Sequence, residues 1–213
     1  MTELLFIRHG ETDWNRQQRF QGQIDVPLND QGRAQAERLG ARLAGEPPDA
    51  FFTSDLQRAR ETAAPLARAW GREPVAMPGL REQAFGIFEG LNVAAITAGH
   101  PELWLRWLEH RADFALPGGE SLRQFHTRVL QSVRELAAAG TGQRMTVVTH
   151  GGVLDMLWRS AHGLPLDGLR ECEIPNTGIN RLRWVNDGLQ IEVWADAAHL
   201  DGLPAQADVR AAR

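Results

Sequence analysis

Apolar and polar residues follow two different periods along this chain. Short apolar runs bounded by glycine, proline or polar clusters predict β-strands. They lie at Glu3 to Ile7, Ala50 to Thr53, Pro74 to Met77 and Met145 to Thr149. Between them, apolar residues recur at helical spacing, which predicts helices at Ala34 to Ala44, Leu56 to Trp70, Glu120 to Ala139 and Val153 to His162. This alternation is typical of a layered α/β domain. We therefore expect a three-layer sandwich in which helices flank a mostly parallel central sheet.

Turn and capping residues define several ends of these elements. Asp55 or Ser54 is a candidate N-cap for the second helix. Near the carboxyl end, Asn186-Asp187-Gly188 separates Gly178 to Val185 from Gly188 to Ala195. An Asp-Gly turn between two such runs predicts a β-hairpin, which adds antiparallel strands to the sheet. The tail from Asp196 to Arg213 is poor in apolar residues, and we expect it to fray.

The stretch 86–117 differs from the rest of the chain. Phe88, Trp104, Trp107 and Phe114 are interrupted there by glycines, prolines and charges. We expect a small, lid-like helical insertion within a single domain that spans residues 1–213. Its aromatic side chains either form a small core of their own or wall a substrate pocket.

Composition excludes several functional classes. The formal charge of −4 is made of mixed signs, which argues against a nucleic-acid partner. No apolar run approaches the roughly 20 residues of a membrane-spanning helix, so we expect no membrane partner. The amino terminus does not resemble a signal peptide, and the single Cys172 cannot form an internal disulfide. Nothing adjacent to Cys172 would stabilise a thiolate nucleophile. These features predict a cytoplasmic protein.

Candidate chemistry begins where the first strand ends, at Arg8-His9-Gly10. In open α/β sheets, ligands bind at the carboxyl ends of the strands. His150 follows another predicted strand in the same way. A phosphate ester needs cationic donors around its oxygens and a nucleophile on one face, which arginines and histidines supply together. The chain contains no lysine, so the use of arginine alone proves little.

Further segments of the sequence support a phosphate site formed by arginines and histidines. Trp14-Asn15, Ser54 to Thr62, Leu80-Arg81-Glu82 and Val147 to Gly152 follow Arg8-His9-Gly10 in the chain. In this order they resemble the histidine phosphatase superfamily, also called the phosphoglycerate mutase-like family, over nearly the whole chain. The resemblance implies a phosphohistidine intermediate on His9, with Arg8, Arg58 and His150 around the phosphate. It also implies that Glu82 is the general acid and base, and that the helical insertion lies near the active site.

Two assignments have named rivals. Arg60 competes with Arg58, but on a helix the two side chains point roughly 200° apart, so only one can face the site. The match to the motif selects Arg58, and Arg60 is expected to pair with a surface carboxylate. Glu89 is the alternative to Glu82.

The resemblance also implies substrate-binding positions. Asn15, Gln21 and Gly22 match positions that hold phosphate through an amide side chain or a backbone N–H, and we add Gly151 beside His150. Many relatives have serine or threonine where this chain has Gln21, which puts the local shape of the pocket in question.

No metal or other cofactor is expected. None of the seven histidines has the His-x-x-x-His spacing that places two ligands on one helix face. A divalent cation beside Arg8 and Arg58 would also be repelled. The expected partner is a small phosphorylated substrate, and a homodimer is left open.

Two activities share this motif chemistry, and the sequence favours metal-independent phosphomonoester hydrolysis. Cofactor-dependent phosphoglycerate mutases of the family carry a longer insertion with basic residues, including tandem arginines, between the glutamate and the second histidine, and they resemble His-Gly-Asn after it. In this chain the stretch is short and the tandem arginines are absent, with only Arg106 and Arg111 as separated candidates, and His150-Gly151-Gly152 follows. The mutase remains the alternative. A non-catalytic relative that binds phosphorylated ligands is disfavoured, because every implied catalytic residue is present.

Overall fold

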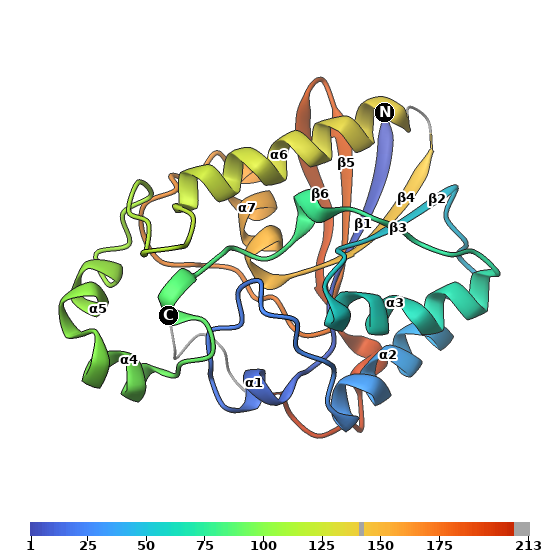
Figure 1. The fold of residues 1–213 in the computed structure, drawn as a ribbon. Coiled ribbons are helices and arrows are strands. Elements are labelled where there is room, and N and C mark those ends of the chain that lie inside the picture. Colours follow the sequence, from blue (N-terminus) through green and yellow to red (C-terminus); the bar gives the residue numbers. More distant parts are fainter. Residues whose placement is uncertain (141–142, 207–213) are drawn as a thin grey trace.

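A six-stranded sheet forms the centre of the computed structural model, which describes residues 1–140 and 143–206 (Figure 1). Its strands are β1 (Thr2–Arg8), β2 (Ala50–Thr53), β3 (Val75–Ala76), β4 (Arg144–Thr149), β5 (Ile179–Val185) and β6 (Gly188–Asp196). They lie in the order β3-β2-β4-β1-β5-β6. The pairs among β1 to β4 are parallel, whereas β5 pairs antiparallel with both β1 and β6. The predicted sheet and its antiparallel hairpin are therefore confirmed.

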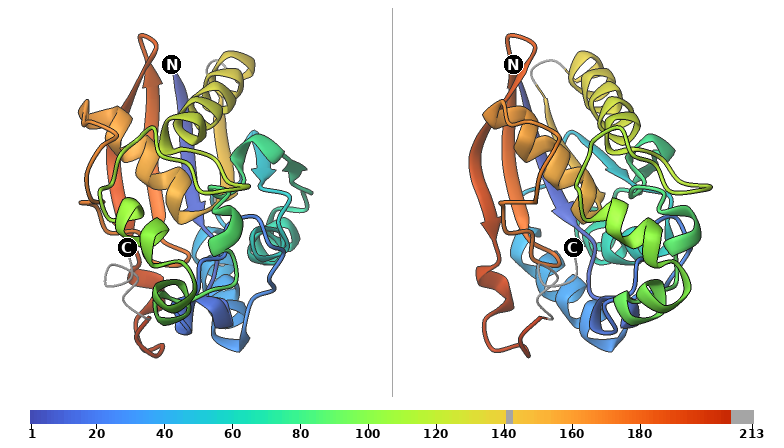
Figure 2. Two further views of the ribbon diagram at one scale, coloured as in Figure 1. Left: turned by 60° about the vertical axis from the view of Figure 1, so that its left-hand side comes forward. Right: turned by 90° about the vertical axis from the view of Figure 1, so that its left-hand side faces the viewer.

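Helices cover both faces of this sheet (Figure 2). The α-helices are α1 (Asp13–Arg16), α2 (Asp30–Leu43), α3 (Gln57–Trp70), α4 (Val93–Gly99), α5 (Pro101–Trp107), α6 (Leu122–Ala139) and α7 (Gly151–His162). Short 3₁₀ turns are η1 (Pro78–Leu80), η2 (Gly86–Phe88) and η3 (Ala198–Leu200). α2 and α3 pack on one face, and α6 and α7 pack on the other. This is the expected three-layer α/β arrangement.

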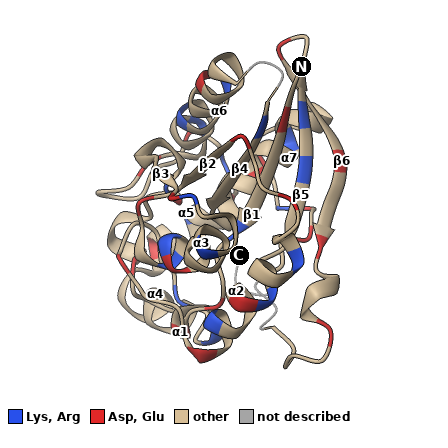
Figure 3. Ribbon diagram, turned by 90° about the vertical axis from the view of Figure 1, so that its right-hand side faces the viewer, with Lys and Arg blue, Asp and Glu red and all other residues tan. Residues whose placement is uncertain are grey.

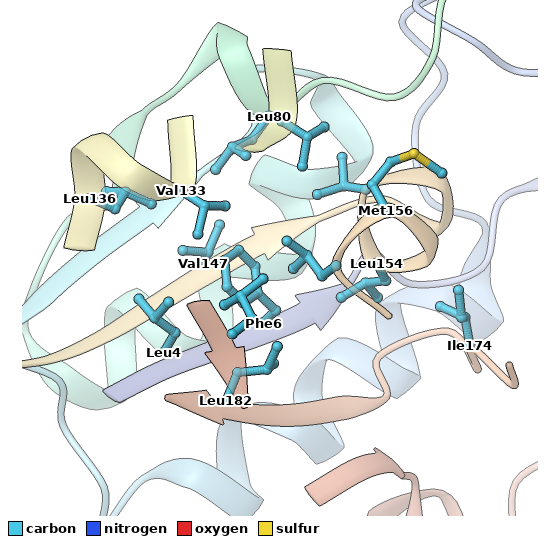
Figure 4. Close-up of a cluster of buried hydrophobic side chains, with 14 of the residues drawn as sticks. Leu4, Phe6, Leu80, Val133, Leu136, Val147, Leu154, Met156, Ile174 and Leu182 are labelled. Carbon is cyan, nitrogen blue, oxygen red and sulfur yellow. The ribbon is translucent and has the colours of Figure 1, made fainter. Parts of the chain in front are cut away.

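Alternate side chains of β1 enter two hydrophobic cores. Leu4 and Phe6 pack with residues of α6 and α7, whereas Leu5 and Ile7 pack with residues of α2 and α3 (Figure 4 shows the first core). Successive strand residues point to opposite faces, so a strand covered on both faces is apolar throughout. Burial of each large apolar side chain contributes roughly 1.5–3 kcal/mol. These cores fix the strand whose end carries Arg8 and His9.

The beginning of α3 corrects a sequence prediction. Its N-cap is Leu56, which has no capping side chain, and the Gln57 N–H instead donates to Asp25 from a distant loop. The predicted caps are engaged elsewhere. Asp55 pairs with Arg81, whose hydrogen bonds lower the pKa of this carboxyl. Ser54 is hydrogen-bonded to His150. A cap supplied by a distant residue leaves no local signal, which is why the sequence pattern pointed to the wrong residues.

Smaller differences concern element ends. α2 begins at Asp30 because Asn29 caps it through the Gly32 N–H, so the helix is longer than the predicted Ala34 to Ala44. β3 is shorter than the predicted Pro74 to Met77, because the chain turns into η1 at Pro78. In the hairpin, Asn186 and Asp187 both have positive φ, as a tight two-residue turn requires.

The segment 86–117 is helical and contains η2, α4 and α5 (Figure 1). A third cluster holds Phe88, Ile96 and Leu116 together with Phe20 and Phe85 from outside the segment. Trp104, Trp107 and Phe114 pack against this cluster. The aromatic side chains therefore form a small core of their own. Trp107 and Phe114 also line a cavity, and that this cavity holds substrate stays a prediction.

Charged residues of both signs intermix on the face shown in Figure 3. Across the part of the chain that the structure describes, no helix combines the length and apolarity needed to cross a membrane.

Candidate active site

The two candidate histidines meet because β1 and β4 are adjacent parallel strands. Arg8 lies opposite Thr149 in the register, and the His9 N–H donates to the Thr149 carbonyl at 2.8 Å. Each histidine directly follows its strand, so both lie at the same edge of the sheet. Their ring centroids are 5.3 Å apart, at an interplanar angle of 57°.

The backbone around His9 fixes the tautomer of its ring. Nδ1 lies 2.7 Å from the Gly10 carbonyl, which can only accept a hydrogen bond. Nδ1 therefore carries the proton, and Nε2 of the neutral ring carries the lone pair. Asn176 Nδ2 donates to the His9 carbonyl at 2.8 Å, and the Gly10 N–H donates to Thr62 Oγ1 at 2.9 Å. A Cβ at Gly10 would lie 2.7 Å from the Gly32 carbonyl, so this close approach needs glycine.

Two buried guanidinium groups lie beside His9. Arg8 Nη1 donates to the Ile174 carbonyl, and the two Nη atoms of Arg58 donate to the carbonyls of Gly22 and Ile24. Burial lowers the pKa of Arg58 to about 10, so the group is still cationic at neutral pH. Among the described residues, Arg58 Nε has no hydrogen-bond partner. A buried donor without a partner is costly, and an anion in the adjoining cavity would satisfy it.

His150 is completely buried, and its ring is neutral at physiological pH. Burial, followed by the positive charges of Arg58 and Arg8, holds the pKa of His150 well below its usual value. Nε2 lies 2.7 Å from Ser54 Oγ, whereas Nδ1 has no hydrogen-bond partner within the described part of the chain. If Nε2 accepts the Ser54 proton, Nδ1–H is left as a donor for an anionic ligand.

This environment predicts a pH-dependent stability. In the unfolded chain His150 binds a proton with the ordinary histidine pKa of 6.5, whereas the folded ring does not, so acid favours the unfolded state. The contribution of His150 is complete above that pKa and is lost as the pH falls. In urea melts at about pH 7.5 and about pH 5.5, His150→Gln should lose roughly 1.4 kcal/mol less than the wild type. Equal losses would contradict a neutral, buried imidazole.

Glu82 reaches the site from the loop after η1. Its Oε1 accepts the Gln83 N–H at 2.9 Å, and its Oε2 accepts the Gly152 N–H of α7 at 3.1 Å. Arg128 of α6 donates to the Glu82 carbonyl at 3.2 Å and thereby holds the loop. A Cβ at Gly152 would lie 2.1 Å from Glu82 Oε1. The observed position of this carboxylate therefore requires glycine at position 152.

A cavity of about 30 Å³ brings most of the predicted site residues together. Its wall contains Arg8, His9, Asn15, Gln21, Gly22, Arg58 and Glu82, together with Trp14, Gln18, Arg19, Phe20 and Phe85. The other two predicted residues lie next to this wall. The His150 ring faces His9, and a Cβ at Gly151 would lie 3.4 Å from Arg8 Nε.

The two predicted amide side chains of the cavity wall, Asn15 and Gln21, differ in the hydrogen-bonding group that is left for a ligand. Asn15 Oδ1 accepts from the Thr12 N–H and hydroxyl, which leaves the amide nitrogen as its donor toward a ligand. Gln21 is 8% exposed, and its Oε1 has no hydrogen-bond partner within the described residues.

The rival residues have other contacts. Arg60 lies on the surface with Nη2 3.9 Å from Asp25 Oδ2, as expected for a surface pair. Glu89 Oε1 accepts the N–H groups of Gln23 and Phe85, so this carboxylate braces the loop that carries Gly22. Neither side chain is part of the cavity wall. Burial, and then the charge of Asp155, raises the pKa of Cys172 to about 12, which makes this thiol a poor nucleophile.

Several supporting residues were not predicted. Ser54 lies within a motif segment, and its contact with His150 could have been suspected from that position alone. Thr62 and Asn176 join backbone groups of the His9 loop to α3 and to the segment before β5. Their partners are distant in sequence, so no local pattern identifies them. Over residues 1–140 and 143–206, no three His, Cys, Asp or Glu side chains form a group that could hold a metal ion.

Sequence and structure comparisons relate this chain to known proteins. The sequence matches the histidine phosphatase superfamily (branch 1) over residues 4–197. It is 37% identical over 204 residues to phosphoglycerate mutase-like protein 4 of Arabidopsis thaliana, covering 93% of this chain and 87% of the relative. It is 33% identical over 207 residues to the metal-independent phosphoserine phosphatase of Arabidopsis thaliana, covering 95% and 85%. The solved structure of Bacillus stearothermophilus YhfR superposes with a TM-score of 0.88 at 30% identity, covering 94% of this chain and 100% of that one.

Proposed function

The chain belongs to the histidine phosphatase superfamily, and from this membership we propose that it hydrolyses phosphomonoesters without a metal, through a phosphohistidine on His9. The observation that carries the proposal is the geometry of His9. Its Nδ1 proton is held by the Gly10 carbonyl, and its lone pair lies on Nε2 in a cavity walled by Arg8 and Arg58. The relatives include enzymes with phosphatase and mutase-like names, so the superfamily supports either class of enzyme.

In the first step, His9 Nε2 attacks phosphorus while Arg8, Arg58 and His150 Nδ1–H stabilise the charge on the phosphoryl oxygens. The bond between phosphorus and the ester oxygen breaks, and that oxygen takes the electron pair. Protonated Glu82 gives its proton to the leaving oxygen and becomes a carboxylate. The products of this step are the free alcohol and phosphohistidine.

In the second step, the Glu82 carboxylate takes a proton from a water molecule, whose oxygen attacks phosphorus. The bond between phosphorus and His9 Nε2 breaks, and inorganic phosphate leaves. Glu82 is again protonated and His9 is again neutral. Gly152 supports both steps, because its N–H orients the carboxylate.

Two features favour hydrolysis over phosphoryl transfer between hydroxyls. Mutases of this family resemble His-Gly-Asn after the second histidine, and a side chain at Gly152 would displace Glu82 from its observed position. Arg106 and Arg111 are also separated, so they do not form a tandem grip for a second phosphate. Phosphoglycerate mutase activity is the second candidate, because the Arabidopsis thaliana relative at 37% identity is named phosphoglycerate mutase-like.

The test is a hydrolysis screen across phosphomonoesters in excess chelator, run beside a coupled mutase assay with and without 2,3-bisphosphoglycerate. We expect release of inorganic phosphate in chelator and little mutase turnover. Activity that disappears in chelator and returns with a divalent ion would overturn the metal-free mechanism. Faster mutase turnover than hydrolysis would favour the second candidate.

A further inference from the structure

A second and larger cavity, of about 320 Å³, adjoins the Glu82 side of the candidate site. It lies between α7, the beginning of α6 and the segments 107–114 and 168–170. Phe85 lines both cavities. Gly152, whose N–H holds Glu82, also lines the larger one. The carboxylate of Glu82 therefore lies at the boundary between the two cavities.

The position of Glu82 between the two cavities indicates which part of the substrate enters the larger one. A general acid must be within hydrogen-bond reach of the leaving oxygen. With the phosphoryl group beside His9, an ester oxygen next to Glu82 directs the alcohol part of the substrate toward the larger cavity. The smaller cavity is walled mainly by charged and amide side chains, which suit the phosphoryl group better than an apolar alcohol.

The wall of the larger cavity is mostly apolar. It contains Phe85, Trp107, Phe114, Phe125, Met156 and Leu169. Aromatic and thioether side chains favour contact with a flat or apolar body. A small polyol such as glycerol would leave most of this surface without contacts.

One charged group in this wall is incompletely compensated. Among the described residues, the wall contains three arginines: Arg111 pairs with Asp167 at 3.7 Å, whereas Arg159 and Arg170 share the single carboxylate of Asp155. Arg159 is satisfied, because it pairs with Asp155 at 3.2 Å and donates to carbonyls of the 165–169 loop, including Pro165 and Leu169. Arg170 Nε is 3.9 Å from Asp155 Oδ1 and has no hydrogen-bond partner in the described part of the chain. Its side chain is 18% exposed.

From this juxtaposition we propose that the larger cavity selects phosphomonoesters of bulky, apolar or aromatic alcohols that carry a carboxylate, with Arg170 as the carboxylate-binding residue. The inference rests on the proposed phosphatase function. Arg170 is a specificity-determining residue here and takes no part in proton transfer. Its guanidinium lies close to Arg8, since both approach the position of a Cβ at Gly151, so the carboxylate binds near the phosphoryl group.

The test compares esters that differ in one feature at a time. Benzyl phosphate against glycerol 3-phosphate measures the contribution of an apolar body, and 3-carboxybenzyl phosphate, whose carboxylate is nearer the phosphoryl group than a para one, against benzyl phosphate measures that of the carboxylate. We expect kcat/KM to rise about tenfold at each comparison, the size of one charge-assisted hydrogen bond or one buried ring face. Equal values for benzyl phosphate and glycerol 3-phosphate would overturn the assignment of the cavity.

Arg170→Gln removes the charge and keeps a side chain of similar length. The carboxybenzyl-to-benzyl ratio of kcat/KM should fall from about ten to about one, mainly through KM. Arg68→Gln, an exposed arginine of α3 that is paired with Glu37, is the matched control and should leave the ratio unchanged. If Arg170 contacts the phosphoryl group instead, both esters will slow equally and the ratio will persist, which overturns the proposal.

A second variant tests the cavity without touching the charge pair. Leu169 is 58% exposed and lines the cavity, so Leu169→Glu should fold normally while it repels a carboxylate. Leu169→Glu should lower the carboxybenzyl-to-benzyl ratio of kcat/KM, whereas Leu105→Glu on the exposed side of α5 should not. The phosphatase proposal and the assignment of the larger cavity would fail with different results. If none of the esters is hydrolysed, the proposed function fails, and if all are hydrolysed equally well, only the cavity assignment fails.

Discussion

His9→Ala is expected to lower phosphomonoester turnover by at least about a thousandfold and to leave the fold intact. The substitution removes the only atom proposed to attack phosphorus, His9 Nε2. The backbone contacts of His9 with Thr149 and Asn176 do not involve its side chain and are retained. Turnover should be measured with a saturating ester, and the thermal unfolding midpoint should be measured beside it.

Phosphoenzyme formation gives a second readout for the same variant. The wild type exposed briefly to labelled ester should retain acid-labile, base-stable phosphate, as expected of a phosphohistidine, and His9→Ala should not. His162→Ala, at an exposed histidine of α7, is the matched control and should be labelled normally. Activity of His9→Ala within tenfold of the wild type would exclude His9 as the nucleophile.

The parts of the site that lie on strand ends could be predicted from the sequence. Arg8 and His9 directly follow an apolar run, and His150 follows another, so the sheet alone brings them together. Because β1 and β4 are neighbouring parallel strands, the residues that follow them lie side by side at one edge of the sheet. Helix geometry predicted that only one of Arg58 and Arg60 faces the site, and the family resemblance selected Arg58, which lines the cavity.

The parts supplied by loops could not be predicted in the same way. The interpretation of Ser54 as a helix cap was wrong, because its hydroxyl contacts His150, 96 positions away. The larger cavity depends on Arg170, in a loop with neither helical nor strand periodicity. The role that we propose for Arg170 follows only from the positions of Arg159, Asp155 and Glu82 in the folded chain. Long-range contacts of this kind leave no local pattern in the sequence, whereas the ends of neighbouring parallel strands do.

Glu82→Gln should slow phosphoryl transfer to His9 unequally for two classes of ester. An alkyl phosphate expels a strongly basic alkoxide and needs a proton from Glu82, whereas a p-nitrophenyl ester expels a weakly basic phenolate that scarcely needs one. We expect a loss of roughly a hundredfold or more with the alkyl ester and less than about tenfold with the nitrophenyl ester. Single-turnover formation of the phosphoenzyme is the proper measurement, because overall turnover also includes activation of the hydrolytic water by Glu82.

The comparison of esters also removes a structural complication. The carboxylate of Glu82 accepts N–H groups from Gln83 and Gly152, and an amide with one oxygen cannot accept both in the same way. That disturbance is identical for the two esters, so only loss of the proton donor depends on the leaving group. Glu89→Gln is the matched control, because Glu89 also accepts two backbone N–H groups but lies outside the cavity wall. Equal slowing of both esters in Glu82→Gln would mean that Glu82 orients the site instead of donating the proton, and an ester-dependent loss in Glu89→Gln would transfer that role to Glu89.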